Sequence, residues 1–432
     1  MSIFKRFGRG VVWCTKRGWK PLLVLVLLLA VAHSIATLVL GRRVEGELQR
    51  IKAEGDPVTG GDLVARGIPD SENGAVVYER VIKAMSARDV ADDLLVVENW
   101  PAGYPGNDHP SPKRLRQALV RLRPMNDLIV EAAYLPKCRF DMRWDKGFEA
   151  PFPQFARMRS MARLMNRAAL TSAEDGRMDE AVRYASAGLR LSESMREEPS
   201  LISSLVRIAM LKISTGTVIQ LATHHSLTPR QAHALYDELA RIDLTPGFVV
   251  ALKGERALVI SNLDDMRRKQ FPYIGRPLFY VDELGCLRAF RTVIREAGAP
   301  SVKELSDDQG SSGLSRYLAF TNTLIPVFNR AHAAKNSGQA EANGVQALLA
   351  LKVYKARFGR YPDTLSQVSS ALGWVLRDDP FSGKSLGYKR IGDGCLVYSI
   401  GRNLKDDGGV EGKVTVGQDP REHGDIVWRL ER

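Results

Sequence analysis

The most distinctive feature of the hydrophobic pattern is one long apolar run near the start of the chain. Residues 21–40, PLLVLVLLLAVAHSIATLVL, contain no formally charged side chain. About 20 residues at 1.5 Å per residue span roughly 30 Å, the thickness of the hydrocarbon core of a bilayer. The run therefore predicts a transmembrane anchor, preceded by a basic segment at residues 1–20. The alternative is a cleaved signal peptide, although its apolar region is normally shorter and ends at a small-residue site.

Beyond this run, apolar residues recur mostly at helical spacing as far as residue 312. The segments with this spacing are residues 73–85, 111–135, 154–173, 179–194, 199–221, 228–242, 248–268 and 284–296. Pro124 is expected to divide the second of them. Residues 137–144 alternate and predict a strand-like or extended piece, and the prolines between residues 98 and 112 predict a long loop. Residues 41–312 are thus expected to form a helical domain. Residues 42–51 could continue the anchor helix, and Gly55-Asp-Pro and Gly60-Gly after them predict a juxtamembrane linker.

The pattern changes again in residues 313–432. A long helix is predicted up to Phe358, with interruptions near Gly338 and Gly344, and a short helix follows at residues 363–372. Residues 386–391 and 395–400 predict a hairpin, and residues 425–430 predict a last strand. The expected fold class is mainly α: a transmembrane helix, a helical-bundle extracytoplasmic domain, and a small C-terminal α+β module with an antiparallel sheet.

The order of motifs in this last part resembles the globular domain of the major pseudopilin of type II secretion systems. The matching motifs are Phe358-Gly-Arg-Tyr-Pro362, Asp379-Pro-Phe, Tyr398-Ser-Ile-Gly401 leading to Asp406-Asp-Gly-Gly409, and Asp425-Ile-Val-Trp428. The resemblance implies a calcium site in the loop at residues 401–424, with Asp406, Asp407 and Asp425 as ligands, because calcium takes several oxygen ligands. Residues 18–23 lack the Glu found near the start of that family's apolar helix, so we expect a pseudopilin-like module rather than a pilus subunit.

A second resemblance lies in the middle of the chain. Gly176-Arg-Met-Asp-Glu-Ala181 and the following Gly188-Leu189 resemble the turn and second helix of a tetratricopeptide repeat. The match covers one unit. It implies two helices joined by a tight turn, with the small residues at positions 181, 185 and 188 letting paired helices approach closely.

Charge indicates how the chain is placed in a membrane. The 62 basic and 49 acidic residues give a formal net charge of +13, and the six Lys and Arg residues before the apolar run have no acidic residue among them. The positive-inside rule then places the N-terminus in the cytoplasm and the bulk of the chain outside the cytoplasmic membrane. A basic exported surface favours anionic lipid head groups or acidic polymers. The chain has no specific nucleic-acid motif.

Two groups of residues are candidates for chemistry. His224, His225, His233 and Asp237 could contribute to a metal site, although scattered histidines at a solvated helix end explain them as well. Arg159, Arg163 and Arg167 follow one another at i, i+4 spacing, which is typical of a solvated or lipid-facing helix face or of an acidic-ligand site. No serine nucleophile elbow, phosphate loop or HExxH zinc motif is present in the sequence.

Two functions are consistent with this sequence. The first is a single-pass envelope protein that binds protein partners, as an assembly or scaffold component related to secretion. The second is a membrane-anchored hydrolase. The hydrolase predicts that several of His109, His224, His225, His233 and Asp237 converge in one pocket of the helical domain, whereas the binding protein makes no such demand.

Overall fold

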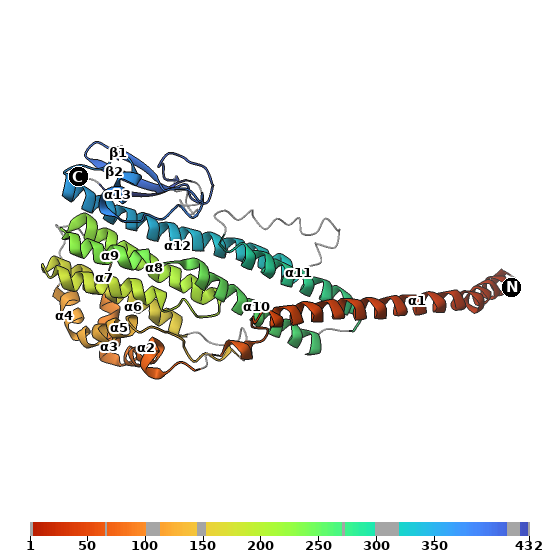
Figure 1. Ribbon diagram of the computed structural model, residues 1–432. Helices are drawn as coiled ribbons and strands as arrows, with labels where there is room; N and C mark the ends of the chain where they lie inside the picture. Colours follow the sequence, from red (N-terminus) through yellow and green to blue (C-terminus); the bar gives the residue numbers. More distant parts are fainter. Residues whose placement is uncertain are drawn as a thin grey trace.

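The protein consists of one long projecting helix and a mainly helical body that carries a small sheet at its far end (Figure 1). The computed structural model describes residues 3–64, 67–100, 113–144, 153–269, 273–298, 319–412 and 424–430, with side chains from Lys20 onward except at Pro153. The predicted loop at residues 98–112 lies mostly outside the described residues. The mainly α fold class predicted from the sequence is confirmed.

The helices of the body follow one another with short connections. Their bounds are α2 Gly74–Ala84, α3 Arg88–Glu98, α4 Lys113–Arg121, α5 Arg123–Ala133, α6 Pro153–Glu174, α7 Met178–Glu193, α8 Leu201–His224, α9 Pro229–Ala240, α10 Leu244–Lys269, α11 Arg276–Arg295, α12 Ala319–Phe358 and α13 Leu365–Leu372. Single 3-10 turns lie at Gly60–Leu63, Asp70–Glu72 and Tyr273–Gly275. Pro124 divides α4 from α5 as predicted, because a proline is tolerated in the first turn of a helix but not in its interior.

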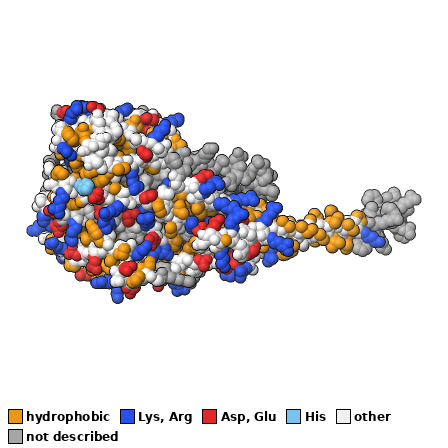
Figure 2. Space-filling view, in the orientation of Figure 1, with side chains coloured by type: hydrophobic (Ala, Val, Ile, Leu, Met, Phe, Trp, Pro, Cys, Tyr) orange, Lys and Arg blue, Asp and Glu red, His pale blue; other side chains and the backbone are white. Residues whose placement is uncertain are grey.

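The projecting helix, α1, runs from Ile3 to Ala53 and includes the whole apolar run. Its apolar side chains are exposed along the rod (Figure 2), and by length and composition it could cross a membrane. Helix α8 also passes this test, but 56% of its most apolar window is buried within the body. Its Arg207 forms an ion pair with Glu193 at 2.8 Å, so we interpret α8 as a core helix.

The helix α1 continues past the apolar run to Ala53, as residues 42–51 allowed, and its last turns pack on the body. Ile51 lies in a small hydrophobic cluster with Ile260 of α10 and Leu287 of α11. Directly after the helix, Asp56 accepts hydrogen bonds from Lys253 at 2.6 Å and Arg256 at 2.8 Å. These contacts join α1 to the body directly. The chain does turn away at Gly55, where φ is +76°, as its glycine predicts.

The middle of the body is a stack of helices with α6, α7 and α8 at its centre. α6 and α7 form the expected helical hairpin, and the chain turns between them at Gly176, where φ is +74°. Gly188 faces Ser214 of α8, so that a Cβ at this position would lie 3.1 Å from the serine hydroxyl. The hairpin geometry is therefore present, while membership of a tetratricopeptide repeat stays a prediction.

Residues 137–144 are extended but do not form a strand. Their alternating side chains, including Phe140 and Trp144, are buried as the pattern predicts. Among the described residues, however, their ladder pairing is limited to one bridge between Lys137 and Asn73. Side chains satisfy the backbone instead: the Asn73 amide bonds the backbone of Arg139, and Glu198 accepts from the Phe140 N–H at 2.8 Å. The alternation therefore reflects burial without a neighbouring strand.

Helix α12 is continuous, so the predicted interruptions near Gly338 and Gly344 are wrong. Both glycines mark places where another element approaches the helix closely. A Cβ at Gly344 would collide with the indole ring of Trp428, and one at Gly338 would come within 3.1 Å of Ile208. Because the helical conformation costs glycine only about 1 kcal/mol, close packing decides these positions.

The sheet is small and antiparallel, with strand order β1-β2-β3. Its strands are β1 Gly387–Ile391, β2 Gly394–Ser399 and β3 Ile426–Leu430, close to the predicted ranges. Val397 pairs with Tyr388 on one side and with Trp428 on the other. The inner face of the sheet packs on α12, and a single hydrophobic cluster runs from α2 through the bundle to β3. Helix α12 therefore connects the helical bundle to the sheet.

Candidate functional site

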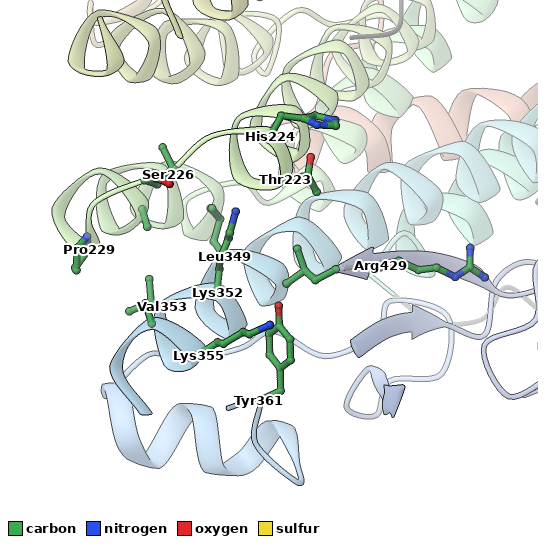
Figure 3. Close-up of a pocket in the computed structure, with 14 residues that line it drawn as sticks. Thr223, His224, Ser226, Pro229, Leu349, Lys352, Val353, Lys355, Tyr361 and Arg429 are labelled. Carbon is green, nitrogen blue, oxygen red and sulfur yellow. The ribbon is translucent and has the colours of Figure 1, made fainter. Parts of the chain in front are cut away.

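A cavity opens between the end of the helical bundle and the C-terminal sheet (Figure 3). Its volume is about 710 Å³, within the range of ligand sites. We call it the lysine cavity, because Lys352 and Lys355 lie on its wall. The other lining residues are Thr223, His224, Ser226, Leu227, Pro229, Ala232, Leu349, Val353, Ala356, Tyr361, Arg429 and Leu430.

The α8–α9 connection forms one side of the lysine cavity. Helix α9 begins at a capping box, in which the Gln231 N–H donates to the Thr228 hydroxyl at 3.3 Å and the Thr228 N–H donates to the Gln231 side chain at 3.0 Å. This cap fixes a tight turn after α8. Thr223 and Ser226 are exposed at the rim, so the cavity is open to solvent on this side.

The last turns of α12 form the opposite side. Leu349, Lys352, Val353 and Ala356 follow i, i+3, i+4, i+7 spacing and therefore share one helix face, which borders the cavity. After the helix, Gly359 adopts φ of +76° and turns the chain back. Tyr361 consequently lies buried beneath the helix, with the Lys355 Nζ 4.5 Å from its ring centroid. Tyr361 thus packs against the end of α12.

The two lysines carry positive charge without a carboxylate partner in the described part of the chain. Lys352 Nζ reaches the His225 carbonyl at 3.5 Å, and Lys355 Nζ donates to the Asp393 carbonyl at 3.0 Å. No described Asp or Glu lies within ion-pair distance of either ammonium group. Burial, followed by the charge of Lys355, lowers the pKa of Lys352. A ligand that supplies negative charge would provide the missing ion-pair partner and would favour the protonated form of Lys352.

The remaining cation on the cavity wall is already paired. The Arg429 guanidinium donates to Glu411 at 2.9 Å and points away from Lys352 and Tyr361 (Figure 3).

His225 also reflects the positive charge near the cavity. Burial, followed by the charge of His224, lowers the pKa of His225, and the charge of Lys352 acts in the same direction. The cavity therefore combines two ammonium groups that have no described carboxylate partner with a largely apolar wall, which suits an anion with an apolar part.

The histidines considered for a metal or catalytic site do not gather in this cavity. His224 lines it, whereas His233 lies 3.7 Å from Asp237 on α9 and packs against Trp374, with ring centroids 5.1 Å apart. His109 lies outside the described residues. In the described ranges, no group of three or more His, Cys, Asp or Glu side chains could hold a metal ion.

The aspartates of the predicted calcium loop lie close to one another but are bound within the loop. Asp425 is buried and accepts N–H bonds from Asp407 at 3.3 Å and Gly409 at 2.6 Å. Burial, together with the charges of Asp407 and Asp406, raises the pKa of Asp425. Carboxylate oxygens are ligands that calcium prefers. As placed among the described residues, however, these three aspartates do not form a group that could hold a metal ion, and they would have to turn from these bonds to do so. Residues 413–423 lie outside the described residues, and the calcium site stays a prediction.

The arginine stripe on α6 is not one continuous surface. Arg159 and Arg163 are exposed, but Arg167 is buried and donates to the Trp100 carbonyl at 2.9 Å. Burial lowers the pKa of Arg167. The spacing rule placed the three residues on one face, but the packing of the segment after α3 covers the end of that face.

Comparison of the chain with models of protein families, with curated proteins and with solved structures gives no match. The resemblances to a pseudopilin and to a tetratricopeptide repeat therefore stay predictions. Sequence reasoning also missed Lys352 and Lys355. Their only local signal is that Lys352 shares a helix face with Leu349 and Val353 and that Lys355 follows it at i+3.

Proposed function

We propose that this protein is a single-pass, membrane-anchored binding component of the bacterial cell envelope. In this proposal α1 anchors the chain in the cytoplasmic membrane, and the body lies outside it. The lysine cavity binds an acidic and partly apolar segment of a partner protein. The protein then acts in assembly rather than in a chemical reaction.

The observation that carries the binding proposal is the pair of lysines without carboxylate partners among the described residues. An unpaired ammonium group in a half-buried position costs free energy, which an incoming carboxylate would offset. The charge-assisted bond itself contributes roughly 1.5–3 kcal/mol. The apolar wall around Leu349 and Val353 would accommodate an aliphatic or aromatic side chain next to the acid.

The anchoring proposal is supported by the exposed apolar surface of α1. In water such a surface would be unfavourable, whereas in a bilayer it contacts acyl chains. The basic residues before the run support a cytoplasmic N-terminus. A role in secretion is a further part of the proposal, supported by the order of α12, α13 and the three strands and by the motifs that resemble a pseudopilin.

The binding proposal is tested with full-length protein in liposomes and two labelled peptides, one alternating glutamate with leucine and the other alternating lysine with leucine. Fluorescence anisotropy should detect binding of the acidic peptide alone, and added salt should weaken it. Equal binding of both peptides would point to a non-specific apolar surface. Failure of the acidic peptide to bind would contradict the proposal.

A further inference from the structure

The 3-10 turn Tyr273–Gly275, which we call the α10–α11 turn, lies beside the apolar part of α1. The Ile274 carbonyl is 3.0 Å from the His33 ring nitrogen Nε2, and the Tyr273 hydroxyl is 3.5 Å from the Ser34 hydroxyl. The rings of His33 and Tyr273 are 5.0 Å apart between centroids. A segment some 240 residues further along the chain is thus level with the middle of α1.

This level lies within the run that the membrane would cover. Leu40, the last residue of the apolar run, is seven residues beyond His33. With a rise of 1.5 Å per residue, His33 lies about 10 Å inside the end of the run. If the run spans the hydrocarbon core, the α10–α11 turn must enter the same leaflet.

The exposed side chains at the turn are aromatic or aliphatic, as contact with lipid requires. Tyr273 is 54% exposed, Ile274 is 81% exposed and Leu278 is 42% exposed, so the body does not cover them. Aromatic and aliphatic side chains of this kind are favoured at the boundary between head groups and acyl chains. Exposed apolar side chains next to a membrane anchor are therefore explained by lipid contact.

Basic residues lie around the base of the anchor helix, as Figure 2 shows. Arg42 and Arg43 are exposed directly after the apolar run, and Arg268 and Lys269 are exposed at the end of α10. Arg268 is also paired with Asp264 at 2.8 Å, and Lys269 with Asp265 at 2.9 Å. Long basic side chains can extend toward lipid phosphates while their stems stay near the acyl chains.

Further contacts hold the turn at a fixed depth along α1. Tyr280 packs against Gly41, where a Cβ would come within 3.4 Å of its ring, and Arg291 forms an ion pair with Glu47. Residue numbers rise in the same direction along both chain segments, from the contact of His33 with Ile274 to the contact of Glu47 with Arg291. Helix α11 therefore runs parallel to α1. The body therefore cannot move away from the membrane without breaking these contacts.

We propose that the α10–α11 turn is a second membrane contact, which inserts Tyr273, Ile274 and Leu278 into the outer leaflet beside the anchor. Two attachment points would prevent the body from rotating freely and would hold the lysine cavity in one orientation. This inference rests on the proposed membrane anchoring of α1. A second copy of the chain covering the turn is the competing explanation.

The test uses full-length protein in liposomes with a fluorescent label at Ile274→Cys. The label is attached in a Cys14→Ser background, because Cys138, Cys286 and Cys395 are buried and should not react. Leu29→Cys in the anchor is the positive control. Val375→Cys is the negative control, since Val375 is 75% exposed and lies next to α9, at the end of the body far from the anchor.

Nitroxide groups carried on the lipid acyl chains should quench the labels at Ile274 and Leu29 several-fold more strongly than the label at Val375. Quenching at Leu29 without quenching at Ile274 would overturn the second contact and leave the anchor in place. No quenching at either position would overturn both. A label at Ile274 that is shielded from water but not quenched by lipid would indicate contact with a second copy, which also overturns the inference.

Discussion

At the scale of single residues, the proposed binding depends on two ammonium groups that have backbone carbonyls, but no described carboxylate, as partners. Lys352 and Lys355 could not be identified from the sequence, because many lysines of the chain have similar neighbours. Their setting arises from packing, because the α8–α9 connection and Tyr361 line the same cavity as the two lysines. In contrast, a motif predicts the aspartates at positions 406, 407 and 425 as calcium ligands, but the motif does not show the hydrogen bonds that they accept within the loop.

The first prediction concerns the double substitution Lys352→Gln with Lys355→Gln. It should weaken binding of the glutamate–leucine peptide by about tenfold to hundredfold, the equivalent of roughly 1.5–3 kcal/mol for a lost charge-assisted bond. Lys83→Gln on α2 is the matched control, because Lys83 is exposed and α2 contributes no residue to the wall of the lysine cavity. A similar loss in the control variant would show that net charge, and not the cavity, governs binding.

The affinity should also depend on pH in a definite direction. Because the pKa of Lys352 is lowered, this ammonium group loses its proton at a lower pH than an ordinary lysine. Binding of an anion favours the protonated form, so affinity should be complete below the lowered pKa and fall as pH rises through it. Anisotropy titrations with the acidic peptide across the alkaline range measure this effect. If Lys352→Gln kept the same dependence of affinity on pH, Lys352 would not be its cause.

The calcium prediction also belongs to this scale. If the loop binds calcium, the full-length protein should melt at a higher temperature in calcium than in chelator, because a ligand of the folded state stabilises it. Asp407→Ala should remove most of that difference. Asp92→Ala on α3 is a control at an exposed aspartate. Equal melting of the unsubstituted protein in both buffers would rule out the site.

At the scale of elements, periodicity predicted most helices and all three strands, and its errors have physical causes. The glycines of α12 were interpreted as helix breaks, but they allow Trp428 and Ile208 to approach the helix. The alternation of residues 137–144 predicted a strand-like or extended piece, and the segment is extended without a partner strand, because side chains of other elements bond its backbone. In both places tertiary contacts, which a local pattern does not contain, decide the structure.

The packing at Gly344 gives a direct prediction. Gly344→Ala should lower the free energy of unfolding by about 1–3 kcal/mol, because the new methyl group overlaps the Trp428 ring. Gly216→Ala in α8 is the matched control: no atom lies within 4 Å of its added Cβ, so the higher helix propensity of alanine should leave stability unchanged or slightly increased. Denaturant unfolding of both variants compares them, and equal effects would refute the packing explanation.

At the scale of the whole molecule, the apolar run predicted the projecting helix, but the sequence could not predict how the body is joined to it. The lysine cavity was equally hidden, because its walls come from residues 223–232, 349–361 and 429–430. Composition and spacing describe each of these stretches separately. Only the packing of α12 between the bundle and the sheet brings them together.

The proposed topology predicts where the chain is found and how it is cleaved. The protein should remain in the membrane fraction after alkaline carbonate washing, because a transmembrane helix is not extracted by charge disruption. Protease added outside the cytoplasmic membrane should digest the body and spare the N-terminal segment. A soluble form that begins near residue 41 would show that the apolar run is a cleaved signal peptide.

The central claim is that the lysine cavity of a membrane-anchored chain holds an acidic segment. The most direct measurement is photocrosslinking of a glutamate–leucine peptide that carries a diazirine to the full-length protein in liposomes, followed by mass spectrometry of the digested product. We predict crosslinks at residues 223–232 and 349–356, and their loss with excess unlabelled peptide. Crosslinks concentrated at the basic base of the anchor, around residues 42–43 and 268–269, would contradict the account.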